Sequence, residues 1–240
     1  MRNLFLSISI LCVLLCLAAC SANGNTDNSL SDVESADAAQ EQTQPQSDRE
    51  ETSVQTVSEP YTKDTSISDV MNDPVFGDYG RLIFPVNSGY YSGDTLGDLS
   101  LTWYSHIDAD KTVEIANYFK THAETGDTIF YDIYTEEEKA ADPEKENTGL
   151  FFFKGTPGEK FAVVNAGGGF AYVAAMHDSF PHALELSKKG YNAFALIYRP
   201  GWDTAVEDLA RAISFIFEHA EELEVDTTVT PFGAALRVVE

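Results

Sequence analysis

The sequence predicts an α/β protein whose mostly parallel sheet is flanked by helices. From residue 161 onward, apolar runs of strand length alternate with helical patterns. This alternation predicts parallel strands joined by right-handed crossovers. The runs are residues 161–164 and 191–198 for strands, and 179–190 and 205–223 for helices. Gly167, Gly168 and Gly169 follow the first strand, and three glycines in a row predict a tight turn at its carboxyl end.

Residues 1–20 have the pattern of a targeting segment. Arg2 is the only charge in it, and the apolar run 4–19 is short for a membrane-spanning helix. It ends in Leu17-Ala18-Ala19-Cys20, which resembles the bacterial lipoprotein lipobox, where the cysteine is acylated and becomes the first mature residue. We therefore expect a lipid anchor at Cys20 and an extracytoplasmic place in the cell envelope. A plain signal peptide cleaved at a small-residue site is the alternative.

The composition of the chain limits the classes of partner and site that we expect. The 240 residues hold 39 acidic and 15 basic side chains, a net charge of −24. No basic stripe interrupts this excess, so we expect no nucleic-acid partner, and we expect membrane contact through the anchor alone. The cysteines are Cys12, Cys16 and Cys20, so residues 21–240 have no disulfide, thiolate nucleophile or cysteine metal site.

The middle of the chain divides into a tether and a folded extension. Residues 21–66 are polar and acidic, which predicts a disordered tether. From residue 67 the sequence predicts a β-rich extension with one helix at 112–122 and a short exposed helix in 135–147, broken by Pro143. The strands expected in this extension are residues 81–86, 99–103, 128–134 and 150–154.

Two helices are predicted in the α/β part. The first starts with Asp178 or Ser179 as N-cap and stops at Gly190. The second carries its acidic residues Asp203, Glu207 and Asp208 early, as a helix amino end favours. Apolar residues at helical spacing predict its buried face. These are Val206, Leu209, Ala210, Ile213, Phe217 and Ala220.

Three motifs in order give the chain a family resemblance. Asn165-Ala166-Gly167-Gly168-Gly169-Phe170 resembles the His-Gly-Gly-Gly motif of α/β-hydrolases of the esterase and lipase type. Ile197-Tyr198-Arg199-Pro200 resembles the strand-end Tyr-Arg of that family. Ala205-x-x-Asp208-x-x-x-Ala212, followed by Glu224-Val225-Asp226, resembles the helix that leads into the nucleophile strand. Residues 67–228 thus resemble the amino-terminal part of an α/β-hydrolase domain.

The resemblance implies a carboxylic-ester hydrolase with a small-molecule ester substrate and no cofactor. Its oxyanion hole would be the turn of Gly167, Gly168 and Gly169, with the Gly168 and Gly169 N–H groups as donors. Asn165 lies near the position where the family has a histidine. The residues expected to line the pocket are Asn165, Phe170, His177, Tyr198 and Arg199.

The nucleophile of that family is missing from the sequence. No Gly-x-Ser-x-Gly elbow occurs, and the serines after the turn are Ser179, Ser187 and Ser214. The family's acid and histidine follow the serine in chain order, so no catalytic triad is present. Codons for residues 229–240, regrouped one base earlier, permit Gly-Tyr-Ser-Leu-Trp-Gly-Gly-Ser-Ala-Gly-Gly-Arg. We therefore expect an aberrant tail at 229–240, made by a frameshift near Thr228, and a truncated, inactive hydrolase; a natural short carboxyl end is the alternative.

Other functions remain open at this point. The chain is alternatively a non-enzymatic surface lipoprotein that binds a small ligand or a protein partner. His177, Asp178 and His182 lie close in sequence, but no further ligand pattern accompanies them, so no metal site is predicted. An ion pair that anchors a strand end is the first interpretation of Arg199, and a substrate contact is the second.

Overall fold

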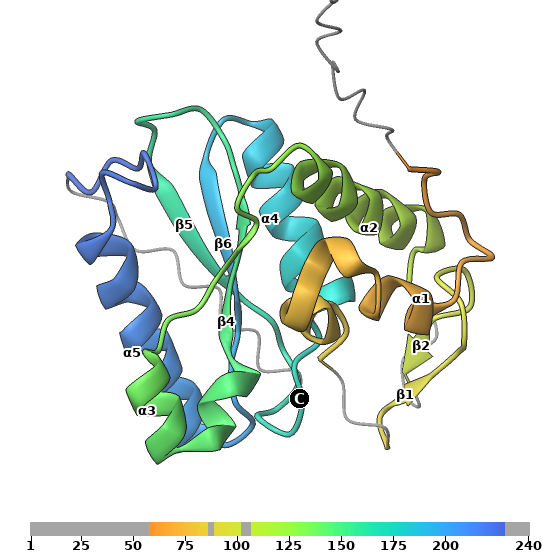
Figure 1. Ribbon diagram of the computed structural model, residues 1–240, viewed down its shortest axis with the longest axis horizontal. Coiled ribbons are helices and arrows are strands. Elements are labelled where there is room, and N and C mark those ends of the chain that lie inside the picture. The colour runs from red at the N-terminus through yellow and green to blue at the C-terminus, as the bar shows by residue number, and fades with distance from the viewer. Residues whose placement is uncertain (1–57, 86–88, 102–106, 229–240) are drawn as a thin grey trace, which may run out of the picture. The chain divides into compact units, whose positions relative to one another are not determined.

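The computed structural model describes residues 58–85, 89–101 and 107–228 (Figure 1). Cys20, the targeting segment, most of the tether and the tail at 229–240 therefore lie outside the described residues. Within the expected tether, Tyr61 is buried, and its N–H donates to Asn117 Oδ1 at 2.7 Å. Folded structure thus begins before residue 67, because Tyr61 ties this polar segment to a helix through its main chain.

The central sheet is mixed and confirms the α/β class. Its order is β3 (Phe130–Tyr131), β4 (Gly149–Phe153), β6 (Asn192–Ile197) and β5 (Phe161–Asn165). β5 and β6 are parallel, whereas β4 is antiparallel to both β6 and β3. Among the described strands, then, parallel pairing is confined to the α/β part.

Helices cover both faces of this sheet (Figure 1). α2 (Ala109–Glu124) and α4 (Ser179–Lys188) lie on one face, and α5 (Trp202–Glu218) lies on the other. Alternation along β4 explains the division. Phe151 and Phe153 meet Phe119 and Phe180 of the two helices, with ring centroids 4.9–5.8 Å apart. Phe152 points the other way and stacks on Phe194 at 4.5 Å.

The amino-terminal extension is more helical than its sequence predicts. α1 (Ile67–Met71) leads into a 3₁₀ segment, η1 (Pro74–Ile83), so the strand expected at 81–86 is wrong over its described residues. The Asp73 side chain accepts from Val75 N–H and Pro74 takes the first helical position, which together start a helix. Before α2, the described residues form two short strands, β1 (Tyr91–Ser92) and β2 (Ser100–Leu101).

The segment between β3 and β4 folds as expected. The strand predicted at 128–134 shortens to Phe130–Tyr131. The exposed helix is α3 (Glu136–Ala141), with Thr135 and Glu138 forming a capping box. Pro143 ends it and opens a 3₁₀ turn, η2 (Pro143–Asn147).

The buried face of α5 differs from the predicted one. Val206 and Phe217 are 48% and 49% exposed, so much of the predicted face looks outward, whereas Leu209 and Ala220 of that face are partly buried against the core. The inward side is formed by Ala205, Asp208, Ala212, Phe215 and Ile216. The prediction failed because α5 carries apolar residues on two sides, and helical spacing alone does not say which side meets the sheet.

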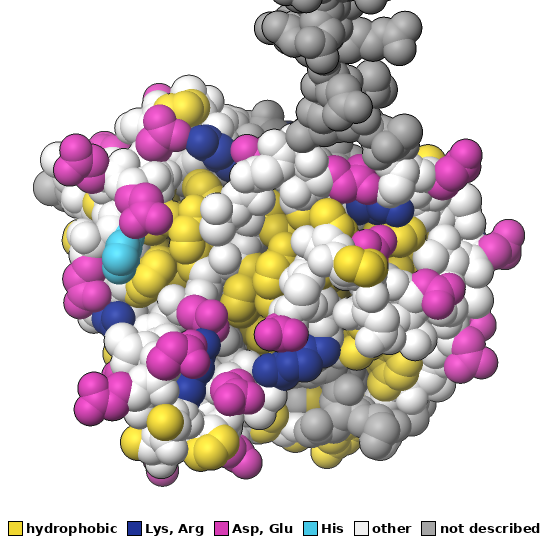
Figure 2. Space-filling view, viewed as in Figure 1, with side chains coloured by type: hydrophobic (Ala, Val, Ile, Leu, Met, Phe, Trp, Pro, Cys, Tyr) yellow, Lys and Arg dark blue, Asp and Glu magenta, His cyan; other side chains and the backbone are white. Residues whose placement is uncertain are grey.

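Acidic side chains outnumber basic ones on the face drawn in Figure 2. Figure 2 shows Asp and Glu side chains spread over one face around a band of apolar side chains, in keeping with the net charge of −24. None of the helices in the described ranges is long and apolar enough to cross a bilayer.

Candidate functional site

The glycine turn follows β5 directly and requires glycine at one position. Gly168 has φ +139°, and a Cβ there would lie less than 3.0 Å from Tyr172 O, closer than real Cβ atoms come. Gly169 has φ +58°, but a Cβ there would meet open space. The main chain is held by Ala171 N–H donating to Gly168 O at 3.0 Å and Ala174 N–H to Gly167 O at 3.1 Å. The Gly-Gly-Gly turn is therefore held in one backbone conformation by these hydrogen bonds.

Two side chains from elsewhere brace this turn. Asp178 Oδ2 accepts from Gly167 N–H at 2.7 Å, and Tyr198 OH donates to Ala166 O at 2.9 Å. Burial, followed by the charge of Asp178, raises the pKa of Tyr198 to about 12. The phenol therefore stays protonated, and remains a donor, at neutral pH. The sequence predicted Asp178 or Ser179 as the helix N-cap. Asp178 holds that position in α4, but its side chain makes no cap bond and accepts from Gly167 N–H instead.

The bracing leaves two main-chain donors at the turn. Gly167 N–H is used by Asp178, whereas the Gly168 and Gly169 N–H groups donate to no acceptor among the described residues. Gly168 is half-buried and Gly169 is exposed. The turn can thus offer two neighbouring N–H groups to an anionic oxygen at the carboxyl end of a buried strand.

Arg199, predicted to line the pocket, is a structural anchor. Its side chain is 3% exposed and bonds to Asp208 through Nε and NH2, at 3.0 and 2.7 Å. It also pairs with Asp142 and Glu207 at 2.8 and 2.9 Å. Burial opposes its charge, but these carboxylates outweigh burial and raise the pKa of Arg199. Arg199 therefore ties the end of β6 to α5 and η2. This agrees with the first interpretation of Arg199 from the sequence, an ion pair that anchors a strand end.

The importance of Asp208 was missed from sequence. Its side chain is fully buried, and it also accepts from Arg199 N–H at 2.7 Å and from Tyr134 OH at 2.8 Å. It was placed with Asp203 and Glu207 in an acidic helix start. The available signal was its spacing: Ala205, Asp208 and Ala212 share one helix side.

A small pocket beside the turn collects three of the predicted residues. Its volume is about 100 Å³. Its lining is Asn165, Phe170, Tyr198, Trp202, Ala205, Val206 and Leu209. His177, also expected there, is not part of the lining; it lies in η3 (Ala175–His177), where burial lowers its pKa.

Asn165 is the unusual member of this pocket. The residue is 4% exposed, and neither amide atom of its side chain has a hydrogen-bond partner among the described residues. A buried amide without partners costs about 1–3 kcal/mol for each unpaired group. The side-chain amide of Asn165 thus lacks hydrogen-bond partners, and the apolar side chains that line the pocket cannot provide them.

The serines after the turn are poor nucleophile candidates. Ser179 is buried at the start of α4, and Ser187 Oγ donates to Leu184 O at 2.8 Å. Ser214 lies exposed in the middle of α5. None of the three serines is among the residues that line the pocket beside the glycine turn.

The structure gives no support for a metal site at His177, Asp178 and His182. His182 Nδ1 lies 2.6 Å from Asp178 O, and no metal-holding group of three His, Cys, Asp or Glu occurs in the ranges that the structure covers.

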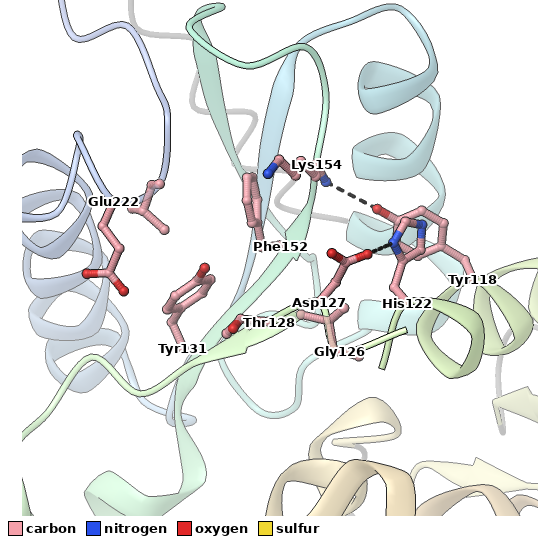
Figure 3. Close-up of a pocket in the computed structure, with 11 residues that line it drawn as sticks. Tyr118, His122, Gly126, Asp127, Thr128, Tyr131, Phe152, Lys154 and Glu222 are labelled. Carbon is pink, nitrogen blue, oxygen red and sulfur yellow. Dashed lines mark hydrogen bonds and ion pairs between the residues drawn. The ribbon is translucent and has the colours of Figure 1, made fainter. Parts of the chain in front are cut away.

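A larger cavity lies at the other end of the sheet (Figure 3). It has a volume of about 180 Å³, between the end of α2 and the residues after β4. His122 Nδ1 and Asp127 Oδ2 are 2.7 Å apart, and this bond lowers the pKa of Asp127. Lys154 N–H donates to Tyr118 OH at 3.1 Å. Because Phe153 pairs with Ala193 at the start of β6, this cavity lies away from the glycine turn.

Comparison with known proteins gives partial structural likenesses. No family model matches the sequence, and no curated protein matches it significantly. One similar solved structure is an acetyl ester-xyloside bifunctional hydrolase from Caldicellulosiruptor lactoaceticus. The match has 21% identity, covers 40% of this chain and 38% of that one, and has a TM-score of 0.35. Another is MGS-M1, an α/β hydrolase enzyme from a Medee basin deep-sea metagenome library, with 22% identity, 33% and 37% coverage, and a TM-score of 0.28. Both are hydrolases, and the chain spans well under half of each, so no conclusion on activity rests on them.

Proposed function

We propose that the glycine turn is the oxyanion site of an esterase-type α/β-hydrolase that acts on carboxylic esters through a serine acyl-enzyme. The observation that carries the proposal is that the N–H groups of Gly168 and Gly169, at the end of β5, donate to no acceptor among the described residues. A developing alkoxide is stabilised by donors that are fixed before the reaction. Asp178 and Tyr198 supply that fixing from two different elements.

The proposal assigns the nucleophile to residues outside these 240. The sequence has no Gly-x-Ser-x-Gly elbow, and its described serines after the turn are buried, bonded or remote from it. The 240-residue chain is therefore proposed to position an oxyanion without being able to form an acyl-enzyme. The lipid anchor at Cys20, also a proposal, would hold this domain at the cell envelope.

The test combines an assay with the gene. The purified 240-residue chain is expected to hydrolyse 4-nitrophenyl acetate no faster than a heat-denatured sample. The DNA after the Thr227 codon, read one base earlier, is expected to encode a Gly-x-Ser-x-Gly elbow, with an Asp and a His farther on. Enzyme-level turnover by the 240 residues, or a shifted frame without these residues, would contradict the proposal.

A further inference from the structure

Phe170 holds a backbone conformation that its side chain disfavours. It follows Gly169 directly and has φ +61°, and in the described ranges it shares positive φ among non-glycine residues with Glu224. A bulky residue in this left-handed region is uncommon and marks a turn or a strained site. Such strain persists where the surrounding structure holds it, and it gathers at functional sites. The contacts that hold Phe170 therefore bear on what the glycine turn does.

Phe170 is one of the two central residues of a β-turn. Ala171 N–H donates to Gly168 O at 3.0 Å, so residues 168–171 form a four-residue turn. Its central residues, Gly169 and Phe170, have φ +58° and +61°. Positive φ at both central positions is the requirement of a type I′ turn, which glycine, asparagine and aspartate satisfy most readily. The turn thus depends on a left-handed Phe170, although phenylalanine suits that conformation poorly.

Each of the two proposed oxyanion donors shares a rigid peptide group with a bonded carbonyl. Because a peptide group is planar and trans, its N–H points opposite to its C=O, and fixing one fixes the other. The N–H of Gly168 belongs to the group of Gly167 O, which accepts from Ala174 N–H at 3.1 Å. The N–H of Gly169 belongs to the group of Gly168 O, which accepts from Ala171 N–H. Two separate hydrogen bonds therefore orient the two donors, and only the second closes the type I′ turn.

Contacts from outside the turn hold Phe170 in place. Its carbonyl oxygen accepts from Gly201 N–H at 2.8 Å. Its ring lies 5.0 Å from the Trp202 ring, at an interplanar angle of 79°, and 6.4 Å from the Tyr198 ring. Edge-to-face ring pairs at such distances are favourable. Tyr198 follows β6 and Gly201 precedes α5, so the segment that joins these two elements offsets the strain at Phe170.

We propose that Phe170 is a positioning residue of the oxyanion site. Held by the segment between β6 and α5, it keeps the type I′ turn closed and so directs the Gly169 N–H toward the oxyanion. The inference rests on the proposed function of the glycine turn. Phe170 acts through the peptide group that carries the Gly169 N–H, so its loss should disturb that donor and spare the Gly168 N–H.

Three substitutions of Phe170 separate the effect of its ring from that of its backbone. Phe170→Ala removes the ring but keeps a Cβ, which disfavours the left-handed backbone, so the turn should open. Phe170→Gly removes the ring as well, but glycine populates positive φ readily, so the turn should stay closed. Phe170→Tyr keeps the ring and its contacts and is the conservative control.

Amide hydrogen exchange at Ala171 in the 240-residue chain reports the turn without any ligand. In Phe170→Ala we expect this exchange to be about tenfold faster or more, because a Cβ penalises the left-handed conformation by about that factor. Phe170→Gly and Phe170→Tyr should change it little. The Gly167 amide, which donates to Asp178, should stay protected in all three variants and so shows that the surrounding fold is intact.

Titration with methylphosphonate, followed at the glycine amide protons, tests the direction of the donor. In the unchanged protein, in Phe170→Gly and in Phe170→Tyr, the amide protons of both Gly168 and Gly169 should shift. In Phe170→Ala the Gly169 shift at saturation should be lost, whereas the Gly168 amide proton should still shift. A side chain that only stabilised the fold would move both responses together.

The outcomes separate this inference from the proposed function. If both glycine amides of the unchanged protein respond and Phe170→Ala leaves both responses intact, or weakens them equally, the positioning role of Phe170 is overturned and the oxyanion function stands. Equal Ala171 exchange in Phe170→Ala and Phe170→Gly overturns it as well. If no glycine amide of the unchanged protein responds, the proposed function itself is contradicted, and the inference falls with it.

Discussion

The matched substitutions Gly168→Ala and Gly169→Ala measure how rigidly the turn is built. The two glycines are neighbours with positive φ, but only Gly168 faces a main-chain atom, the carbonyl oxygen of Tyr172. For Gly169→Ala, left-handed strain of about 1–2 kcal/mol is partly offset by about 0.4–1 kcal/mol from the more restricted unfolded chain. A net loss of about 1 kcal/mol or less is expected there.

Gly168→Ala adds a steric term that the turn cannot absorb without moving. Strained backbone conformations cost up to about 3 kcal/mol, and the displaced carbonyl adds to this, so a loss of about 3 kcal/mol or more is expected. The assay is urea unfolding of both variants, compared through midpoints at unchanged m-value. Equal losses for the two alanines would refute the claim that the turn has the described geometry.

Three further predictions concern the groups around the turn. Asp208→Asn should lower the free energy of unfolding by about 3 kcal/mol, because it removes the buried carboxylate that pairs with Arg199. Glu207→Gln, which removes a more exposed partner of Arg199, should lower it by less than about 1 kcal/mol. Similar urea midpoints for the two variants would contradict this. Tyr198→Phe should lower the free energy of unfolding by about 1 kcal/mol, because Ala166 O loses its hydrogen-bond donor. An unchanged urea midpoint would show that this hydrogen bond does not stabilise the turn. Burial lowers the pKa of His177, so the unfolded chain binds a proton first and stability should fall as pH drops below about 6.5; His177→Gln should flatten that dependence, and an unaltered pH profile would contradict it.

The α/β part was predictable because its signals are local. The apolar run at 161–165, the glycines after it and Gly190 each act within a few residues, and β5, the turn and α4 follow as expected. The strand at β6 was predicted for the same reason. Local apolar runs and breakers were enough wherever one segment dictated its own conformation.

The face of α5 depends on partners far along the chain. Its two apolar sides are equivalent in sequence, and Arg199 at the end of β6 draws Asp208, and with it one side of the helix, inward. The residues at 81–83 show the same limit, since an apolar run expected as a strand lies in a 3₁₀ segment that a kink at Gly77 separates from the turn starting at Asp73 and Pro74. Tertiary contacts decided these elements.

The candidate site was predictable in part. The motif located Asn165, Phe170 and Tyr198, and the structure brings all three to one pocket. The role of Asp178 was not visible from its sequence neighbours, because its hydrogen bond to Gly167 closes a turn that only the folded chain forms. Hydrogen bonds of this kind depend on the folded backbone and are not visible in the local sequence pattern.

The most direct test of the oxyanion claim is a residue-resolved titration of the protein's amide protons with methylphosphonate, a tetrahedral oxyanion. The account predicts saturable downfield shifts of the Gly168 and Gly169 amide protons, which have no acceptor in the part of the chain that the structure describes. The Gly167 amide proton, already bonded to Asp178, should move little. No shift at Gly168 and Gly169, or an equal shift at Gly167, would contradict the claim.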